Sequence, residues 1–394
     1  MRLLFFKHSL AWPRSSGHDV HAFHMMQACV QLGAIVSLAT VRTPAPEALD
    51  GLPLARHIPV DVREPATLTS RPMPLTRMQE RFRSYYGVPT DRIREVADAA
   101  QDVEADAVIA VGLEALPYLS GDLGARVRAW YAADEWVLHH LSLLKLGDPD
   151  LKTHAKSAVV KGLYERAYAP VVDRAWVVSN AERRAMRWFA GVRHADVVPN
   201  GVDGNFFQPT SRQPNPRSAV FWGRLDFEPN VQGLQWFCER IWPDVRRQAP
   251  DATLTVLGFA ANDIVKKLVT APGIRLIENL PDLREEVGAQ AAVVLPFVSG
   301  GGIKNKLLEA AAMGKPIVCT PRVLSGLKGD PPLVQARTPA EWSAALLGIW
   351  NDDARRRQLG TAARTWVLEH HTWTAAARDA LAGLEASRAE RAAW

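Results

Sequence analysis

The sequence predicts an α/β protein with two doubly wound halves, each a parallel sheet covered by helices on both faces. Short apolar runs alternate with amphipathic segments along most of the chain, which is the pattern of parallel sheets. The 394 residues are too many for one ordinary core and indicate two domains. The polar, proline-bearing stretch QPTSRQPNPRS at 208–218 separates two such series and is typical of a linker.

The first half contains short apolar runs bounded by loops, which predict buried strands at 2–6, 35–40, 107–111, 127–133, 175–179 and 196–199. Apolar residues recur at helical spacing between these runs, which predicts helices at 18–32, 89–101, 151–168 and 181–190. This half is expected to form an N-terminal domain over 1–205, followed by a linker at 206–218.

The second half repeats the alternation, with strands expected at 219–223, 253–258, 274–279, 291–296 and 316–320. Its helices are expected at 231–248, 283–289, 303–313 and 339–350. After Asp352 the chain is rich in alanine and strongly helix-forming, which predicts two more helices. The expected C-terminal domain is 219–370, with a last helical segment at 371–394.

Composition narrows the class of protein. The chain is 47% hydrophobic and 23% charged, as in a soluble globular protein, and no apolar run reaches the roughly 20 residues that cross a bilayer. The opening MRLLFFKHSLAWP is interrupted by Lys7, His8 and Pro13, which favours a first strand over a signal peptide. Three widely spaced cysteines argue against a disulfide framework. We therefore expect a cytoplasmic protein.

The charge balance, 47 basic against 42 acidic residues, is compatible with phosphorylated ligands or an anionic membrane face. No motif that combines basic and aromatic residues indicates nucleic acid. No group of His, Cys, Asp or Glu has metal-ligand spacing, and an Asp-x-Asp signature is absent from the sequence. We expect neither a metal nor a cofactor.

The stretch SGGGIKNKLLEAAAMGKP at 299–316 carries the main functional prediction. It follows a predicted strand and opens a helix, and ligands of parallel sheets bind at the carboxyl ends of the strands. Glycine backbone, the helix start and the two lysines suit a diphosphate, while Glu309 suits two adjacent ribose hydroxyls. The alternative is a surface turn followed by a helix with an ordinary Lys–Glu pair.

These residues and four further segments carry a resemblance to a family. The segments are LLEAAAMGKPIV (307–318), VVPNGVD (197–203), FWGRLDFEPNV (221–231) and PDATLTVLG (250–258). In their order along the chain they resemble retaining glycosyltransferases of family 4, which have the GT-B fold of two facing Rossmann-like domains. The resemblance is dense from about 197 to 346 and implies that the last helix returns to the N-terminal domain.

The resemblance implies transfer of a sugar from a nucleoside-diphosphate sugar to a hydroxyl of a glycan, lipid-linked or polysaccharide acceptor, with retention and without a metal. It assigns Glu309 to the ribose. The expected donor-binding residues are Gly17, Arg224, Gly300, Gly301, Gly302, Lys304, Asn305, Lys306, Leu308 and Glu309. Asp134 and Glu135, at the end of a predicted strand, are the candidates for catalysis beside the acceptor.

The chain departs from the family pattern at two positions. Gly301 stands where members commonly have the first of two glutamates, and Pro229 and Asn230 stand where a lysine usually follows the arginine of GRL. We therefore expect the diphosphate to contact Arg224, with Lys304 or Lys306 in place of the missing lysine.

Several alternatives stay open. Arg224 could instead form a structural ion pair with Asp226 or Glu228, and Asp134 could cap the following helix. The basic and aromatic segment at 78–86 fits either peripheral contact with the inner membrane face or a solvated helix. For the whole chain, the alternatives to a transferase are a non-catalytic sugar-nucleotide-binding protein and a sugar-nucleotide epimerase.

Overall fold

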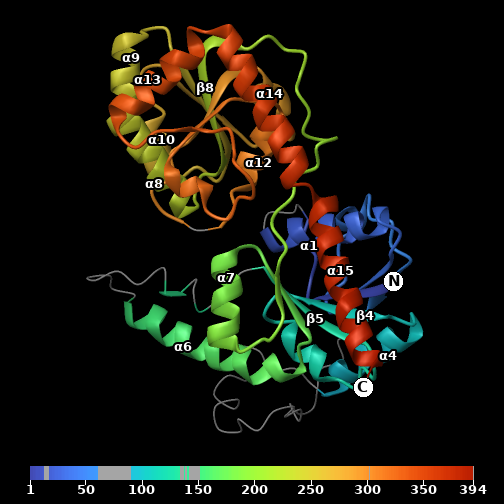
Figure 1. Ribbon diagram of the computed structural model, residues 1–394. Helices are drawn as coiled ribbons and strands as arrows, with labels where there is room; N and C mark the ends of the chain where they lie inside the picture. The colour runs from blue at the N-terminus through green and yellow to red at the C-terminus, as the bar shows by residue number, and fades with distance from the viewer. Residues whose placement is uncertain are drawn as a thin grey trace. The chain divides into compact units, whose positions relative to one another are not determined.

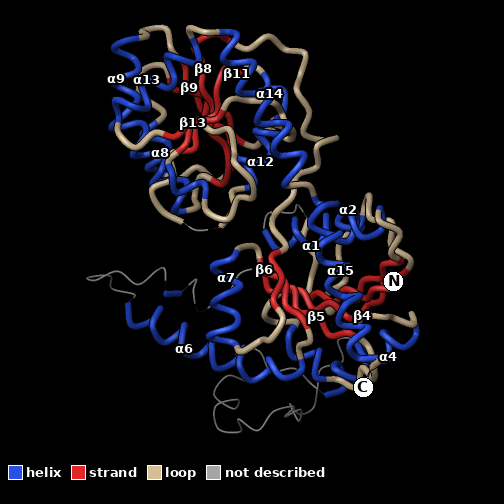
Figure 2. Tube along the Cα trace, viewed as in Figure 1, coloured by secondary structure: helices blue, strands red, loops and turns tan. Residues whose placement is uncertain are grey.

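The computed structural model describes residues 1–12, 17–60, 90–133, 137, 140–141, 151–300 and 302–393. It divides into two compact units. Unit 1 comprises Met1–Pro199 and Trp373–Trp394, and unit 2 comprises Asn200–Thr372. In each unit a parallel sheet is enclosed by helices (Figures 1 and 2). The α/β class predicted from the sequence, with two doubly wound sheets, is confirmed.

In the described part of unit 1 the sheet has seven parallel strands in the order β3-β2-β1-β4-β5-β6-β7. They are β1 (Arg2–Lys7), β2 (Ile35–Thr40), β3 (Arg56–Pro59), β4 (Ala107–Val111), β5 (Val127–Ala133), β6 (Arg174–Val177) and β7 (Ala195–Val197). The helices are α1 (Gly17–Gln31), α2 (Pro46–Leu49), α4 (Thr90–Asp102), α6 (Leu151–Tyr168), α7 (Asn180–Ala185), the π-helix η3 (Met186–Ala190) and α15 (Trp373–Ala392). Short 3-10 turns are η1 (Leu116–Ser120) and η2 (Ala169–Val171).

The two faces of this sheet can be followed in β1. Leu3 and Phe5 pack in one core cluster with residues of α1 and α15, while Leu4 and Phe6 pack in the other with residues of α4, α6 and η3. Alternate side chains of a strand point to opposite faces of the sheet. A run of apolar residues such as RLLFF therefore requires that helices cover both faces. Helix α15 therefore belongs to the fold of unit 1, as Figure 1 shows.

In the described part of unit 2 the sheet has six parallel strands in the order β10-β9-β8-β11-β12-β13. They are β8 (Asn215–Arg224), β9 (Thr253–Phe259), β10 (Ile274–Glu278), β11 (Gln290–Leu295), β12 (Ile317–Cys319) and β13 (Val334–Gln335). The helices are α8 (Glu228–Trp236), the π-helix η4 (Phe237–Ile241), α9 (Trp242–Gln248), α10 (Asp263–Leu268), α11 (Arg284–Gly288), α12 (Asn305–Ala312), the 3-10 turn η5 (Pro321–Leu324), α13 (Pro339–Trp350) and α14 (Asp353–His370).

Some element boundaries differ from those expected. Strand β8 begins at Asn215, inside the stretch expected as a linker: its first three residues are exposed, and Asn215 pairs with Gln290 of β11. Strands β3 and β13 and helix α10 were not predicted, since they are short and lack a buried apolar run. No helix in the described ranges is both long and apolar enough to cross a membrane.

Candidate functional site

The candidate site lies in unit 2, at the carboxyl ends of β8 and β11. These strands pair in parallel, so both end at the same edge of the sheet. Strand β8 ends with Gly223 and Arg224, and β11 is followed by the glycine loop and then by α12. In the loop, Gly300 has φ 82° and Gly302 has φ 68°. Residues that carry a side chain rarely adopt this left-handed backbone conformation, so the turn depends on glycine.

Lys306, in the first turn of α12, places its ammonium at the end of β8. Its Nζ donates to Oδ1 of Asn230 over 2.8 Å and lies 4.5 Å from the ring centre of Phe221 and 5.1 Å from that of Phe297. Burial lowers the pKa of Lys306 to about 7; Glu309 acts against this lowering and Lys304 adds to it. The ammonium is thus held by an amide and two aromatic faces, and a bound anion would favour its charged form.

Gly223 makes room for that ammonium. A Cβ atom at Gly223 would lie 2.6 Å from Nζ of Lys306 and 3.0 Å from Nδ2 of Asn230, closer than packed atoms approach. Its φ of 144° also favours glycine. The amide of Asn230 is fixed in turn, because Nδ2 donates to the carbonyl oxygen of Arg224 over 2.7 Å. Strand β8, helix α8 and helix α12 therefore meet at one cation.

Glu309 lies one turn further along α12 and is partly buried. Its Oε2 accepts a hydrogen bond from Nε1 of Trp222 over 3.0 Å. Burial raises the pKa of Glu309, while the Trp222 hydrogen bond and the charge of Lys306 oppose the rise. Lys306 and Glu309 each meet a partner outside α12, so they are not the ordinary Lys–Glu pair of a surface helix.

Arg224 forms the ion pair with Asp226 that the sequence left open as an alternative. It forms a two-point pair with Asp226, Nε to Oδ1 at 3.0 Å and Nη2 to Oδ2 at 2.8 Å. These hydrogen bonds raise the pKa of Arg224 and lower that of Asp226. The side chain of Arg224 is 48% exposed, and exposed pairs of this kind are worth little. An anion could therefore compete with Asp226 for Arg224 at small cost.

Three other expected donor-binding residues lie on α12 or at its start. Lys304 is the N-cap of α12, with Nζ 5.3 Å from the ring centre of Phe297. Asn305 accepts a 2.5 Å hydrogen bond from Nδ2 of the buried Asn200. Leu308 is fully buried in the core of unit 2, so only its backbone can face a ligand.

In unit 1, Gly17 is the first residue of α1. A buried ion pair lies close to it in the chain: Nζ of Lys7, at the end of β1, is 2.8 Å from Oδ1 of Asp19. Sequence reasoning missed this pair, although a lysine that directly follows the apolar run RLLFF was a signal. Gly301, Asp134, Glu135 and the segment 78–86 lie outside the described residues. Across the described ranges, no group of three or more His, Cys, Asp or Glu side chains could hold a metal ion.

Part of unit 2 matches a known protein family. Residues 216–352 match the family model "Glycosyl transferases group 1". The chain is 25% identical over 306 residues to a D-inositol 3-phosphate glycosyltransferase of Corynebacterium kroppenstedtii, a match that covers 66% of this chain and 64% of that protein. The matches span from 26% to 64% of the length of the curated relatives.

Two solved structures share the fold of the whole chain. The sucrose-phosphate synthase of Thermosynechococcus elongatus has a TM-score of 0.68 at 16% identity, and the match covers 100% of both chains. HepE of Anabaena, solved in complex with UDP and glucose, has a TM-score of 0.63 at 13% identity over 97% of this chain and 99% of its own. Residues 216–352 are therefore similar to glycosyl transferases group 1 domains, and the chain has the two Rossmann-like domains of the GT-B fold.

Proposed function

We propose that the protein is a glycosyltransferase that moves a sugar from a nucleoside-diphosphate sugar to a hydroxyl group of an acceptor, with retention at the anomeric carbon. The observation that carries the proposal is the cluster of Lys306, Glu309 and the glycine loop at the carboxyl edge of the unit 2 sheet. It lies inside the matched family domain, and HepE, which shares the fold, was solved with UDP and glucose.

Each part of the cluster has a role in this proposal. Glu309 would accept hydrogen bonds from the ribose hydroxyls through the carboxylate that Trp222 orients. Lys306 would face the diphosphate, and Arg224 would join it by leaving Asp226. We place the backbone N–H groups of the glycine loop and the start of α12 on the same phosphates. Gly17 stays a proposed donor-binding residue.

The reaction breaks the bond between the anomeric carbon and the phosphate oxygen and forms one from that carbon to the acceptor oxygen. The acceptor proton goes to the departing phosphate oxygen, which accounts for all atoms without a further reactant. Negative charge grows on the phosphate as the bond breaks, so fixed cations beside it speed its departure. We propose that Lys306, Lys304 and Arg224 supply this charge in place of a metal.

On the acceptor side, we propose Asp134 and Glu135 as the residues that orient the hydroxyl. The acceptor class proposed is a glycan or a lipid-linked or polysaccharide precursor, in the cytoplasm or at the inner membrane face. One specific observation favours a second candidate function. Gly301 replaces a glutamate that family members commonly carry, which fits a protein that binds sugar nucleotides without turnover.

An acceptor-dependence assay tests the proposal. The full-length protein is incubated with nucleotide sugars, singly, with and without a panel of sugar and lipid-linked acceptors. The expected result is nucleoside diphosphate release together with a glycosylated product, only when an acceptor is present. Binding without turnover across the panel would identify the non-catalytic alternative, and epimerised sugar without transfer would identify an epimerase. The exposed-site variant Glu239→Gln serves as a control beside Glu309→Gln.

A further inference from the structure

A basic surface with exposed apolar side chains lies in unit 1, on α6, α7, η3 and the loop up to His194. We call it the α6–η3 surface. Its basic side chains are exposed: Lys152, Lys156, Arg166, Arg183, Arg184, Arg187 and Arg193. The acidic residues of these helices, Glu165 and Glu182, are both buried. The charge that these helices present to solvent is therefore entirely positive.

Large apolar side chains stand among these cations. Trp188 is 81% exposed, the highest value among the exposed large apolar residues of the described chain, and Val159 on α6 is 63% exposed. Phe189 adds a second partly exposed aromatic ring beside Trp188. Tryptophan side chains of monomeric proteins are seldom exposed to this extent. Exposed apolar side chains on a charged surface are typical of interaction sites.

The π-helical turn explains why Trp188 and Phe189 are outside. The amide of Gly191 donates to the carbonyl oxygen of Met186 over 3.0 Å, which closes a wider turn than an α-helix has. Met186 and Ala190 are both fully buried and fix this turn to the core that also contains residues of α6. The residues between them, including Arg187, are left on the outer side of the turn.

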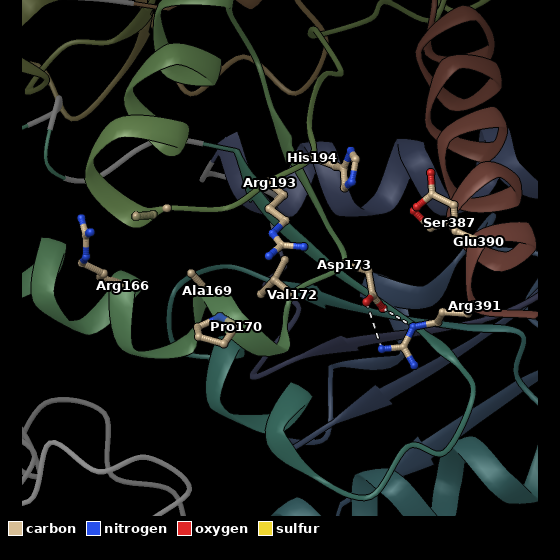
Figure 3. Close-up of a pocket in the computed structure, with 12 residues that line it drawn as sticks. Arg166, Ala169, Pro170, Val172, Asp173, Arg193, His194, Ser387, Glu390 and Arg391 are labelled. Carbon is tan, nitrogen blue, oxygen red and sulfur yellow. Dashed lines mark hydrogen bonds and ion pairs between the residues drawn. The ribbon is translucent and has the colours of Figure 1, made fainter. Parts of the chain in front are cut away.

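A pocket of about 640 Å³ joins the ends of α6 and η3. Figure 3 shows that the pocket is lined by Arg166 of α6 and by Arg193 and His194 of the loop after η3. Its other side is formed by α15, where Arg391 makes a two-point pair with Asp173 at 2.9 Å for each bond. Thus α6, the segment after η3 and α15 line one pocket, which contains the acidic Asp173 and Glu390 as well as basic side chains.

This pocket lies at the amino ends of β6 and β7, since Asp173 precedes β6 and His194 precedes β7. Ligands of parallel sheets bind at the carboxyl ends of the strands. The pocket is therefore at the opposite edge of its sheet from a substrate site.

We propose that the α6–η3 surface docks the protein on a bilayer that contains anionic phospholipid. Trp188 and Phe189 would enter the headgroup region, where aromatic side chains concentrate in membrane-bound proteins. The exposed lysines and arginines would meet lipid phosphates, and the rim formed by Arg166 and Arg193 would receive one of them.

A bilayer accounts for the surface better than nucleic acid does. Nucleic acid would pair with the cations and could stack on one ring, but it has nothing to cover an exposed aliphatic side chain such as Val159. An interface of headgroups and acyl chains can cover exposed aliphatic and aromatic side chains and also pair with cations. The proposal does not depend on the transfer reaction, so it can fail while the proposed function holds, and the reverse.

The test is sedimentation of the full-length protein with vesicles. One set contains phosphatidylcholine alone, and the other an equimolar mixture of phosphatidylcholine and phosphatidylglycerol. We expect binding to the mixed vesicles only, weakened by salt. The double variant Arg184→Glu, Arg187→Glu should bind at least about tenfold more weakly. Trp188→Ser should bind several-fold more weakly, and the conservative variant Trp188→Phe should recover most of the binding.

Matched controls lie in unit 2. Arg355 and Arg357 are exposed on α14, and Ile264 is 47% exposed on α10. The double variant Arg355→Glu, Arg357→Glu has the same charge change, and Ile264→Ser removes a comparable exposed apolar group. Both should bind as the natural protein does. Equal binding to the two vesicle types, equal losses in test and control variants, or binding to duplex DNA but not to vesicles would overturn the proposal.

Discussion

Nζ of Lys306 on α12 lies 2.8 Å from Oδ1 of Asn230 on α8. The ammonium group of α12 is therefore next to an uncharged side chain of α8. Asn230 stands two residues into α8, near the place where the resembling family has its lysine. One of the two departures from the family pattern is thus offset, because Lys306 of α12 places a cation beside the position where α8 lacks a lysine.

The first prediction concerns Lys306→Met. Loss of a charge-assisted hydrogen bond costs about 1.5 to 3 kcal/mol, so affinity for a nucleoside diphosphate should fall roughly tenfold to a hundredfold. Affinity for the matching nucleoside should not change. Titration calorimetry measures both, with Lys266→Met on the exposed face of α10 as control. An equal loss for diphosphate and nucleoside would show that Lys306 is not at the phosphates.

The second prediction is proton uptake on binding. Burial lowers the pKa of Lys306 to about 7 in the ligand-free protein, so above that pH the amine is mostly neutral. A bound diphosphate favours the ammonium and raises this pKa, so binding at about pH 8 should take up a proton. Calorimetry in two buffers of different ionisation enthalpy measures the uptake. Equal proton uptake by the Lys306→Met variant on binding would show that Lys306 is not the group that takes up the proton.

The third prediction uses a pair of glycines. In Gly223→Ala the new Cβ would lie 2.6 Å from Nζ of Lys306, so the ammonium must move and diphosphate affinity should drop severalfold. Gly33 also has a left-handed φ, 87°, but its Cβ would meet open space. Gly33→Ala therefore tests backbone strain alone and should lower the melting temperature without affecting the ligand. Matching ligand losses in both variants would refute the placement of Lys306.

The fourth prediction concerns the ribose. Glu309→Gln should weaken the binding of a ribonucleoside diphosphate about tenfold or more, because the ribose hydroxyls lose a charged hydrogen-bond acceptor. The 2′,3′-dideoxy analogue should bind almost equally to both proteins. Trp222→Phe removes the indole N–H that orients the carboxylate and should give a smaller loss of the same kind. If the dideoxy analogue loses as much affinity as the natural nucleotide, Glu309 does not contact the ribose.

The sequence predicted the fold well where periodicity was strong. The expected helices at 151–168 and 339–350 agree with α6 and α13, and α13 begins with a capping box formed by Thr338 and Glu341. Strand β3 was missed because RHIP has no apolar run and is only partly buried at the sheet edge. Its pairing depends on β2, which local sequence does not reveal.

The candidate site was predicted less completely. The segment 299–316 could be recognised because its glycines, lysines and glutamate are close in sequence. The contacts with Asn230 and Trp222 could not, since they join residues 76 and 87 positions apart. For Arg224 the sequence left open a diphosphate contact and an ion pair with Asp226 or Glu228, and the structure contains the pair with Asp226.

The most direct test of the central claim is a crystal structure of the protein with a nucleoside diphosphate that a thermal-shift screen identifies. We predict phosphate oxygens within about 3 Å of Nζ of Lys306 and of the backbone N–H groups after Gly300, with ribose hydroxyls on Glu309. A nucleotide bound elsewhere, with Lys306 still hydrogen-bonded only to Asn230 and Glu309 only to Trp222, would contradict it.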